Sequence, residues 1–469
     1  MNGAMTSEMT SLSGDEVPDG VGAPALAAAD SSAAANTAGE FSGASQGPTA
    51  SAMNQGLATL PERCDVLVVG AGPAGSACAA TLARAGFDVV LVDAQPFPRD
   101  KVCGDGLIPD AHHAMRRLGV LDEVMALAQH AGHVACIGPR GGRVDVPGTL
   151  AVLQRRQLDD VLCRSAAAAG ARMHAPARFM APLEEVQNGM PHVVGARLQA
   201  GATTREIRAG WVVLATGAVP QALIAAGVCE RRTPSAIALR GYIRNPSMTG
   251  RITELEVLWH PRLKPGYGWI FPCRDGVFNI GVGVAHSRAK GDRIRATMEG
   301  VNLRDSLKAF TEVYEPAREL VAGGSWVGEP KGAPLRCSLD GARHSRPGLL
   351  VTGEAAGSTY AFTGEGIGKA LETGILAGEA IIEGRSSTTD DAIVRSRYET
   401  RVAALKPRYE VYEKANTVNA HPWLVELLAW SARRSPRRLK RMSGVLEETH
   451  TPGNLISFRS WMRLLFERG

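Results

Sequence analysis

The stretch DVLVVGAGPAGSACAATLARAGFDVVLVDA, residues 65–94, decides the fold. It begins with an apolar run at 66–69, passes through a glycine turn into a helix-forming segment, and ends in a second apolar run at 89–92. Short apolar runs of this kind are typical of strands that are buried on both faces of a parallel sheet. The stretch therefore predicts a strand–helix–strand unit.

The glycine turn has the G-x-G-x-x-G spacing of dinucleotide-binding proteins. The first glycine permits the tight turn, the second lets backbone amides approach a pyrophosphate, and the third lets the helix pack close to the sheet. The positive end of that helix would face the phosphates, and an acid after the second strand can accept hydrogen bonds from a ribose. The predicted dinucleotide contacts are Gly70, Gly72, Pro73, Ala74, Gly75 and Asp93. The alternative is a βαβ unit with a purely structural role.

Length and charge limit the classes of function. The chain has 469 residues, which suggests two to three domains, and 45% of them are hydrophobic, which is enough for a large core. The net charge is +5, but residues 1–60 contain six acids and no Lys or Arg, so the remainder carries about +11. The sequence has no zinc-finger spacing, basic zipper or aromatic RNA-binding motif, so we predict no nucleic-acid partner.

The cysteines are scattered and form no C-x-x-C pair, so no structural zinc or other metal site is predicted. Scattered cysteines in a large chain fit the reduced thiols of the cytoplasm. No run of about 18 apolar residues occurs, and the N-terminus lacks the features of a signal peptide. We therefore expect a cytoplasmic protein.

The apolar patterns predict an α/β fold in which a Rossmann-like domain is built from separated segments. Residues 1–61 are rich in Ala, Ser, Gly and Thr, which predicts a disordered low-complexity tail. The Rossmann-like domain is assigned to residues 62–110, 150–225 and 335–385, an inserted antiparallel-sheet domain to 111–149 and 226–334, and a helical C-terminal region to 386–469.

A second motif, LLVTGEAAG at 349–357, looks like the second fingerprint of flavoproteins, in which the acid holds a ribityl hydroxyl. Here the acid is Glu354, where Asp is commoner. The turn at 363–368 then opens a helix, and its amides would lie near the isoalloxazine edge, where negative charge develops on reduction. The flavin contacts expected from these two segments are Gly353, Glu354, Gly357, Gly364, Gly366 and Ile367. The alternative is a glycine-rich helix that packs on a sheet.

Two further motifs, PRDKVCGDG at 98–106 and PGYGWIFP at 265–272, complete a family pattern. With the first two motifs they resemble the geranylgeranyl reductase family, a group of flavoproteins shaped like para-hydroxybenzoate hydroxylase. In that family a P-R-x-K-x-C-G-x-G loop precedes the substrate domain, and a Y-x-W-x-F-P strand lines the prenyl pocket. The resemblance extends from about residue 62 to about residue 385.

This resemblance implies that the Rossmann-like domain binds FAD, with Lys101, Cys103 and Gly104 close to the cofactor. The segment RRQLD at 155–159 also resembles R-x-x-L-D, in which the arginine reaches the cofactor, and Arg155 fits that spacing. The alternative for this segment is a capped helix start with solvated arginines. Because only one G-x-G-x-x-G turn follows a strand, the reductant, NAD(P)H or a ferredoxin-like protein, would bind transiently.

The reaction implied is saturation of carbon–carbon double bonds in a polyprenyl, geranylgeranyl-type lipid or its diphosphate, by hydride transfer from the flavin. Cys103 is a candidate proton donor. Tyr267, Trp269 and Phe271 alternate along one strand, so they would face the same side and form an aromatic wall against a lipid chain. Their alternative role is ordinary sheet core.

Two other functions fit the same motifs. One is a flavin monooxygenase or halogenase on the same fold, and the other is a flavin-binding redox sensor without turnover.

The C-terminal region adds an apolar segment at 423–430, a basic run that follows it, and apolar residues at helical spacing over 455–465. A basic amphipathic region of this kind predicts peripheral contact with the inner face of a membrane. Its alternative is a set of helices that cap the substrate domain with a solvated basic face.

Overall fold

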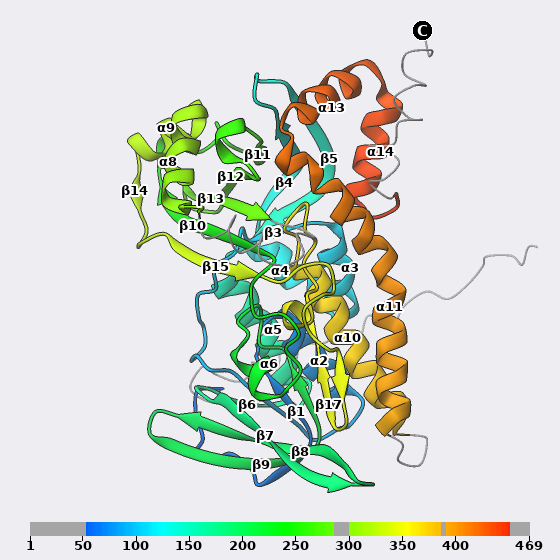
Figure 1. Cartoon of the computed structure of the whole chain (residues 1–469). Helices are drawn as coiled ribbons and strands as arrows, with labels where there is room; N and C mark the ends of the chain where they lie inside the picture. Colours follow the sequence, from blue (N-terminus) through cyan, green and yellow to red (C-terminus); the bar gives the residue numbers. More distant parts are fainter. Residues whose placement is uncertain (1–52, 286–299, 386–390, 451–469) are drawn as a thin grey trace, which may run out of the picture. The chain divides into compact units, whose positions relative to one another are not determined.

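The strand–helix–strand unit predicted at 65–94 is present in the computed structural model (Figure 1). It consists of β1 (Arg63–Val69), α2 (Pro73–Arg84) and β2 (Val89–Val92), and the two strands pair in parallel. All four residues of β2 are buried, as expected of a strand that is covered on both faces. The structure describes residues 53–285, 300–385 and 391–450, which belong to one compact unit that starts at Gln46.

β1 and β2 lie in the middle of the first sheet, whose strand order is β16-β17-β9-β1-β2-β6. β7 pairs with β8, and β8 joins the sheet through β9. The other strands are β6 (Arg172–His174), β7 (Arg178–Gln187), β8 (Met190–Ala200), β9 (Thr203–Leu214), β16 (Ser345–Arg346) and β17 (Leu349–Val351). Segments from three distant parts of the sequence thus form one sheet.

Helices cover one face of this first sheet. α2 packs between α5 (Arg155–Ala168) and α10 (Ile367–Gly384). The approach of α10 to α2 requires glycine, because a Cβ at Gly374 would lie 2.2 Å from the carbonyl oxygen of Ala74. On the opposite face, α6 (Gln221–Ala225) and the β7–β8–β9 strands bury the alternate residues of β1 and β2.

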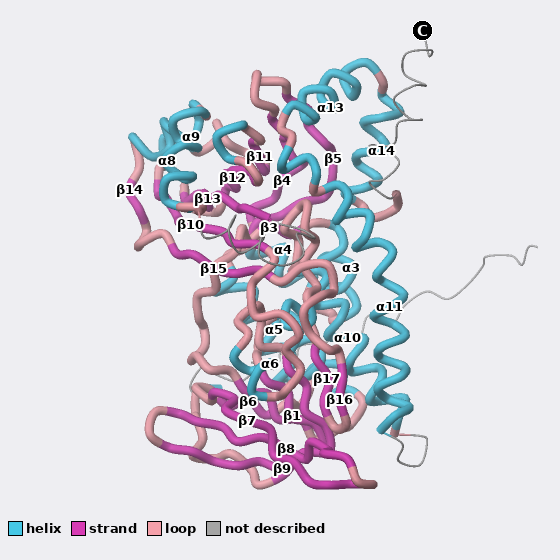
Figure 2. The backbone as a smooth tube through the Cα atoms, viewed as in Figure 1, coloured by secondary structure: helices cyan, strands magenta, loops and turns pink. Residues whose placement is uncertain are grey.

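The second sheet lies apart from the first (Figure 2) and has the order β14-β10-β13-β12-β11-β4-β5-β3, with β15 beside β10. Its neighbouring strands are antiparallel except for the pair β11 and β4. The strands are β3 (Gly106–Leu107), β4 (Gln129–Ile137), β5 (Arg143–Val152), β10 (Ala236–Arg244), β11 (Leu255–Leu258), β12 (Gly266–Pro272), β13 (Val277–Ala285), β14 (Ser325–Trp326) and β15 (Lys331–Leu335).

The two faces of the second sheet are covered by different helices. α8 (Leu303–Val313) and α9 (Glu315–Ala322) bury one face, where Ile270 and Phe310 share a core. The other face is closed by C-terminal helices that pack on β4 and β5 (Figure 1). The C-terminal helices are α11 (Asp391–Ala415), α12 (Thr417–Ala420), α13 (Trp423–Arg434) and α14 (Pro436–Leu446). The predicted α/β architecture with an antiparallel sheet and C-terminal helices is therefore confirmed.

One segment packs differently from its sequence assignment. Residues 111–149 were assigned to the inserted domain, but α3 (Pro109–Arg117) packs on α10, and both α3 and α4 (Leu121–Leu127) contribute to the core beneath the first sheet. Only β4 and β5 of that segment join the second sheet. The amphipathic pattern of a short helix shows that one face is buried but not which sheet buries it.

Residues 53–61 belong to the folded unit. Met53, Leu57 and Leu60 are buried, and the side chain of Asn54 makes two hydrogen bonds, of 2.6 and 2.8 Å, with the backbone of Phe97. For residues 53–61 the prediction of a disordered tail is wrong, because these side chains bury apolar surface against the first sheet. Residues 1–52 lie outside the described residues, as do the apolar residues at 455–465.

Candidate flavin site and active site

The first and third glycines of the turn are required by close backbone contacts. Gly70 has a φ of +102°, and a Cβ there would lie 2.3 Å from the carbonyl oxygen of Ala215. A Cβ at Gly75 would lie 1.7 Å from the carbonyl oxygen of Gly70. These contacts bring the N-terminus of α2 against the end of β1, as the fingerprint predicts.

The second glycine serves a different purpose. A Cβ at Gly72 would meet no backbone atom within 4 Å, and its nearest neighbours would be the guanidinium groups of Arg99 and Arg155, each 3.7 Å away. Gly72 therefore faces open space with two cations beside it. This arrangement suits the approach of a pyrophosphate to the helix N-terminus.

This space is part of a cavity of about 750 Å³ that runs from the glycine turn to the second sheet. Three predicted site residues do not line it: Gly75, Gly353 and Gly357 support the fold from inside, and a Cβ at Gly353 would lie 2.5 Å from the Cβ of Ala74. The predicted residues that line the cavity are Gly70, Gly72, Pro73, Ala74, Asp93, Lys101, Cys103, Gly104, Arg155, Tyr267, Trp269, Phe271, Glu354, Gly364, Gly366 and Ile367.

A network of two acids and two arginines fixes the wall at the end of β2. The Asp93 carboxylate accepts hydrogen bonds from the Ala71 amide at 2.9 Å and from Arg99 at 3.1 and 3.2 Å. Asp159 is fully buried and binds Arg99 at 3.0 Å and Arg155 at 2.7 and 2.9 Å. Asp159 is the acid of the R-x-x-L-D segment, and it holds both guanidinium groups beside Gly72. The ribose contact of Asp93 stays a prediction.

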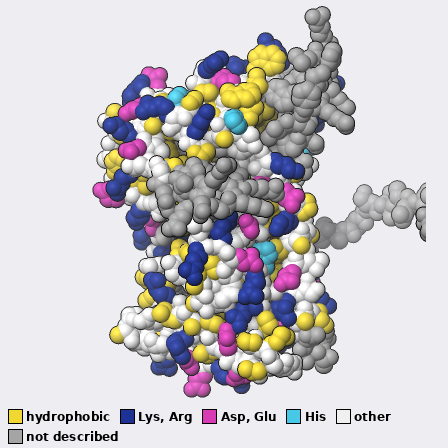
Figure 3. All heavy atoms as spheres, viewed as in Figure 1, with side chains coloured by type: hydrophobic (Ala, Val, Ile, Leu, Met, Phe, Trp, Pro, Cys, Tyr) yellow, Lys and Arg dark blue, Asp and Glu magenta, His cyan; other side chains and the backbone are white. Residues whose placement is uncertain are grey.

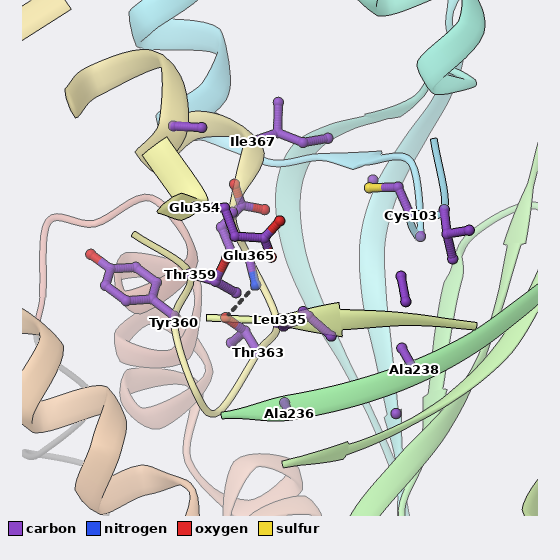
Figure 4. A pocket seen from close by; sticks show the side chains of 18 of the residues that line it. Cys103, Ala236, Ala238, Leu335, Glu354, Thr359, Tyr360, Thr363, Glu365 and Ile367 are labelled. Carbon is purple, nitrogen blue, oxygen red and sulfur yellow. Dashed lines mark hydrogen bonds between the residues drawn. The ribbon is translucent and has the colours of Figure 1, made fainter. Parts of the chain in front are cut away.

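The second fingerprint and the turn after it form another wall. In Figure 4, Glu354, Thr359, Thr363 and Glu365 lie on one side of the cavity, and Cys103 lies across from them. The amide of Glu365 donates to Thr363 Oγ1 at 3.2 Å, and its carboxylate accepts from the Gly368 amide at 2.9 Å. Burial raises the pKa of Glu365 well above its ordinary value.

Below this turn lies a buried cluster of charges. Lys369 Nζ lies 2.9 Å from Glu372, 3.0 Å from Glu448 and 3.4 Å from Asp110. Burial raises the pKa of Asp110, and Lys369 opposes that rise. Glu448 follows α14, so the cluster connects the C-terminal helices to α10 and α3.

The Cys103 loop is held by residues that the motif did not single out. Arg240 is buried in β10, and it donates to the carbonyl oxygens of Cys103 at 3.1 Å and of Lys101 at 2.9 Å. Asn279 Nδ2 donates to the Cys103 carbonyl and to the Asp105 carboxylate, both at 2.8 Å.

Burial raises the pKa of the Cys103 thiol, and Arg155 opposes the rise. The thiol is therefore held in its protonated form at neutral pH.

The three aromatic residues of β12 form a continuous wall. The ring centroids of Tyr267 and Trp269 are 6.2 Å apart, and those of Trp269 and Phe271 are 6.3 Å apart. Trp269 Nε1 donates to Asn279 at 2.9 Å, and the Tyr267 hydroxyl donates to the Thr363 carbonyl at 2.7 Å. The strand that would bind substrate is thus hydrogen-bonded directly to the turn predicted at the flavin edge.

Beyond this wall the cavity is lined by apolar side chains. Val134, Val146 and Val257 contribute from the sheet, and Leu428 and Leu446 contribute from α13 and α14. The C-terminal helices therefore form part of the cavity itself. Their sequence predicted a capping role only as an alternative to membrane contact.

The residues present fit FAD. The cavity begins at a helix N-terminus with two arginines, passes the Glu354 segment and reaches the aromatic wall. Thr216 lines the same space, and its buried Oγ1 has no hydrogen-bond partner among the described residues, which is consistent with a polar group of a cofactor binding there.

Over residues 53–285, 300–385 and 391–450, no group of three or more His, Cys, Asp or Glu side chains could hold a metal ion. No helix in that part of the chain is long and apolar enough to cross a membrane.

Comparison with known proteins identifies an FAD-binding domain and related reductases. A family model described as an FAD binding domain matches residues 63–239. The menaquinone reductase of Mycolicibacterium smegmatis is 34% identical over 343 residues, which cover 69% of this chain and 77% of that protein. Digeranylgeranylglycerophospholipid reductase 1 of Methanopyrus kandleri is 27% identical over 401 residues, which cover 82% of this chain and 98% of that protein.

Solved structures share the fold. A geranylgeranyl bacteriochlorophyll reductase-like protein from Thermoplasma acidophilum has a TM-score of 0.67 at 21% identity and covers 87% of this chain and 96% of its own. A flavin-dependent brominase has the same TM-score at 18% identity, with 87% of this chain and 100% of its own covered. The fold alone therefore does not separate reductases from halogenases.

Fold, cavity and matched domain together define an FAD-dependent oxidoreductase. Within that class, the chain belongs to the geranylgeranyl reductase family.

Proposed function

We propose that this protein saturates isolated carbon–carbon double bonds in the prenyl chain of a polyprenyl lipid. The observation that carries the proposal is the apolar extension of the cavity, which starts at the aromatic wall of Tyr267, Trp269 and Phe271 and continues between the second sheet and α13 and α14. A long apolar chain fits such a space. The relatives named for menaquinone and for digeranylgeranylglycerophospholipid act on molecules that carry prenyl chains.

The residues of this chain would bind, orient and protonate the alkene. FAD, when bound and reduced, supplies hydride to one alkene carbon. The other carbon needs a proton, and Cys103 carries one on a thiol that faces the cavity. The aromatic wall excludes water and orients the prenyl chain. The wall lies directly beside the Cys103 loop, because a Cβ at Gly104 would lie 3.3 Å from the Phe271 ring. The two electrons come from a reductant that binds transiently, NAD(P)H or a ferredoxin-like protein.

The test is anaerobic turnover of the FAD-loaded protein with a chemical reductant. A menaquinone is the first substrate to try, because the menaquinone reductase has the higher identity of the two relatives. We expect products heavier by two hydrogen atoms per saturated bond, in more than stoichiometric amount. Product that forms only when oxygen is admitted would identify a monooxygenase or halogenase instead. Flavin oxidation without multiple turnovers would identify a redox sensor.

A digeranylgeranyl phospholipid and geranylgeranyl diphosphate, assayed beside the menaquinone, would separate the head groups. Equal rates with all three would place recognition in the prenyl chain alone.

A further inference from the structure

α13 is apolar on two opposite faces. Its inner face buries Val425, Ala429 and Ala432 against the second sheet and places Leu428 in the cavity wall. Its outer face presents Trp423, Leu427 and Trp430, with exposed fractions of 54%, 37% and 43%. Residues spaced by four and three form one stripe along a helix. A stripe with two exposed tryptophans is costly to leave in water, so it indicates a contact surface.

The charges around this stripe are of one sign. No acidic residue occurs between positions 427 and 446, and the exposed charged side chains of that segment are Arg433, Arg434, Arg437, Lys440 and Arg441. The guanidinium of Arg434 lies 4.2 Å from the ring centroid of Trp430, so positive charge reaches the stripe itself. In Figure 3, hydrophobic and basic side chains lie together over the region of α13 at the top of the view.

Two of the acids that flank this segment, Glu426 and Glu448, are bound to other partners. Glu426 accepts hydrogen bonds from the amides of Arg140 at 2.6 Å and Gly142 at 3.2 Å in the β4–β5 turn. Glu448 binds Lys369 at 3.0 Å and Arg408 at 2.7 Å. Neither carboxylate neutralises the five exposed cations, which form no ion pair within the described ranges. The surface therefore attracts anions.

We propose that the outer face of α13, with the five basic residues that follow its stripe, docks onto an anionic lipid bilayer. Tryptophan and arginine are the side chains suited to a membrane–water interface, where the rings lie among head groups and the cations meet phosphates. Three exposed side chains are too small a patch for a stable dimer, which needs about 800 Å² per partner.

This docking gives the proposed substrate a short path. The inner face of α13 lines the cavity and its outer face meets the bilayer, so only the thickness of one helix, about 10 Å, separates them. A prenyl lipid could move from the bilayer to the aromatic wall without crossing bulk water. This part of the inference rests on the proposed function, whereas the docking does not.

The test is sedimentation of the FAD-loaded full chain with vesicles of phosphatidylcholine alone or with about 30% phosphatidylglycerol. We expect at least about tenfold stronger binding to the anionic vesicles, with most of the difference lost between about 0.05 and 0.5 M salt.

The triple variant Trp423→Ser, Leu427→Ser and Trp430→Ser should weaken binding about tenfold or more. A matched control replaces Met180, Val186 and Met190 with Ser, because these exposed apolar residues lie on the β7–β8 strands of the other sheet, and it should bind as wild type does.

Retained flavin and an unchanged melting temperature would show that the triple variant is folded. Equal binding of the triple variant and wild type, or no binding of wild type to anionic vesicles, would overturn the docking. A concentration-dependent dimer that the triple variant abolishes would also overturn it and would assign the stripe to a second copy of the chain. Vesicle binding without alkene reduction would leave the docking standing and contradict only the proposed function.

Discussion

Asn279 Nδ2 lies 2.8 Å from the carbonyl oxygen of Cys103, although 176 positions separate the two residues in the chain. The same amide group donates to Asp105 and its oxygen accepts from Trp269, so one buried side chain fixes both the thiol loop and the aromatic wall. The relative position of the proposed proton donor and the proposed substrate wall therefore depends on Asn279.

Replacing Asn279 with Ala should damage stability and chemistry together. The substitution leaves buried polar groups of Cys103, Asp105 and Trp269 without this partner, and each such group costs about 1–3 kcal/mol. We expect a loss of roughly 3 kcal/mol in the free energy of unfolding and weaker FAD binding, measured by denaturant titration and flavin content. Asn302→Ala is the control, because Asn302 caps α8 away from the cavity and should cost about 1 kcal/mol with FAD binding unchanged. Normal flavin content in the Asn279 variant would contradict this role.

The glycines of the turn should separate folding from cofactor binding. Gly72→Asp places a carboxylate beside Arg99 and Arg155 without a backbone clash, so the variant should fold and contain no FAD. Gly75→Ala forces a Cβ to within 1.7 Å of the Gly70 carbonyl oxygen, so that variant should lose stability itself. Circular dichroism and flavin absorbance measure the two effects. A yellow, fully loaded Gly72→Asp protein would refute the assignment of the phosphate site.

Cys103→Ser should keep the flavin and slow alkene saturation. A hydroxyl is a much weaker acid than a thiol, and a positioned general acid contributes about 100-fold or more to a rate. We expect a loss of about that size in the anaerobic assay, with unchanged flavin content. Cys136→Ser is the matched control, because Cys136 also lines the cavity but lies in β4. A wild-type rate for the Cys103 variant would end its candidacy as proton donor.

Where the sequence signal was local, the predicted site segments come together in the structure, and their cofactor and substrate roles stay predictions. The turn at Gly70, the helix after it and the alternation of Tyr267, Trp269 and Phe271 each depend on spacing within a few residues, and the structure brings these segments to one cavity. Arg240 was missed because its partner Cys103 is 137 positions away. Asp159 stood in the quoted R-x-x-L-D segment, but its second partner, Arg99, is 60 positions away. A buried arginine in a strand has no periodic signature.

The sequence did not assign helix faces, for a related reason. Trp423, Leu427 and Leu428 are all apolar, so composition alone does not tell which of them faces the sheet and which faces solvent. In α3, likewise, the sequence assigned the segment to the inserted domain, and only the tertiary contact with α10 shows that it packs on the flavin domain. In both cases the missing information is the identity of the neighbouring element.

Asp105 should make stability depend on pH. Burial raises its pKa to about 6, against the opposing effects of Arg240, Tyr242 and Asn279. Between the unfolded value of about 4 and the folded value, the folded chain binds more protons than the unfolded chain, so stability falls as the pH rises through this window. Two pKa units correspond to roughly 3 kcal/mol.

Asp105→Asn removes this dependence. The stability of the variant relative to wild type should therefore increase from about pH 4 to about pH 6 and stay level above it, as measured by denaturant unfolding at each pH. Asp100→Asn is the control, because Arg240 and Lys331 outweigh burial and lower the pKa of Asp100; its effect has the opposite sign and lies below about pH 4, so its difference should stay level between pH 4 and 6. A flat difference for Asp105→Asn between pH 4 and 6 would contradict the raised pKa.

Leu428→Trp should shorten the cavity without touching the flavin. Leu428 lines the apolar extension beside α14, at the far end from the glycine turn, and a larger ring there fills space that a long prenyl chain would occupy. Each CH₂ group that can no longer be buried costs about 0.8 kcal/mol, so we expect the KM for a long-chain menaquinone to rise about tenfold or more. A short prenyl substrate should be affected less than about threefold.

Leu427→Trp is the matched control, because Leu427 lies on the outer face of α13 and the substitution keeps that position apolar. Equal losses for long and short chains, in a Leu428 variant that retains its FAD, would show that the prenyl chain does not occupy this end of the cavity.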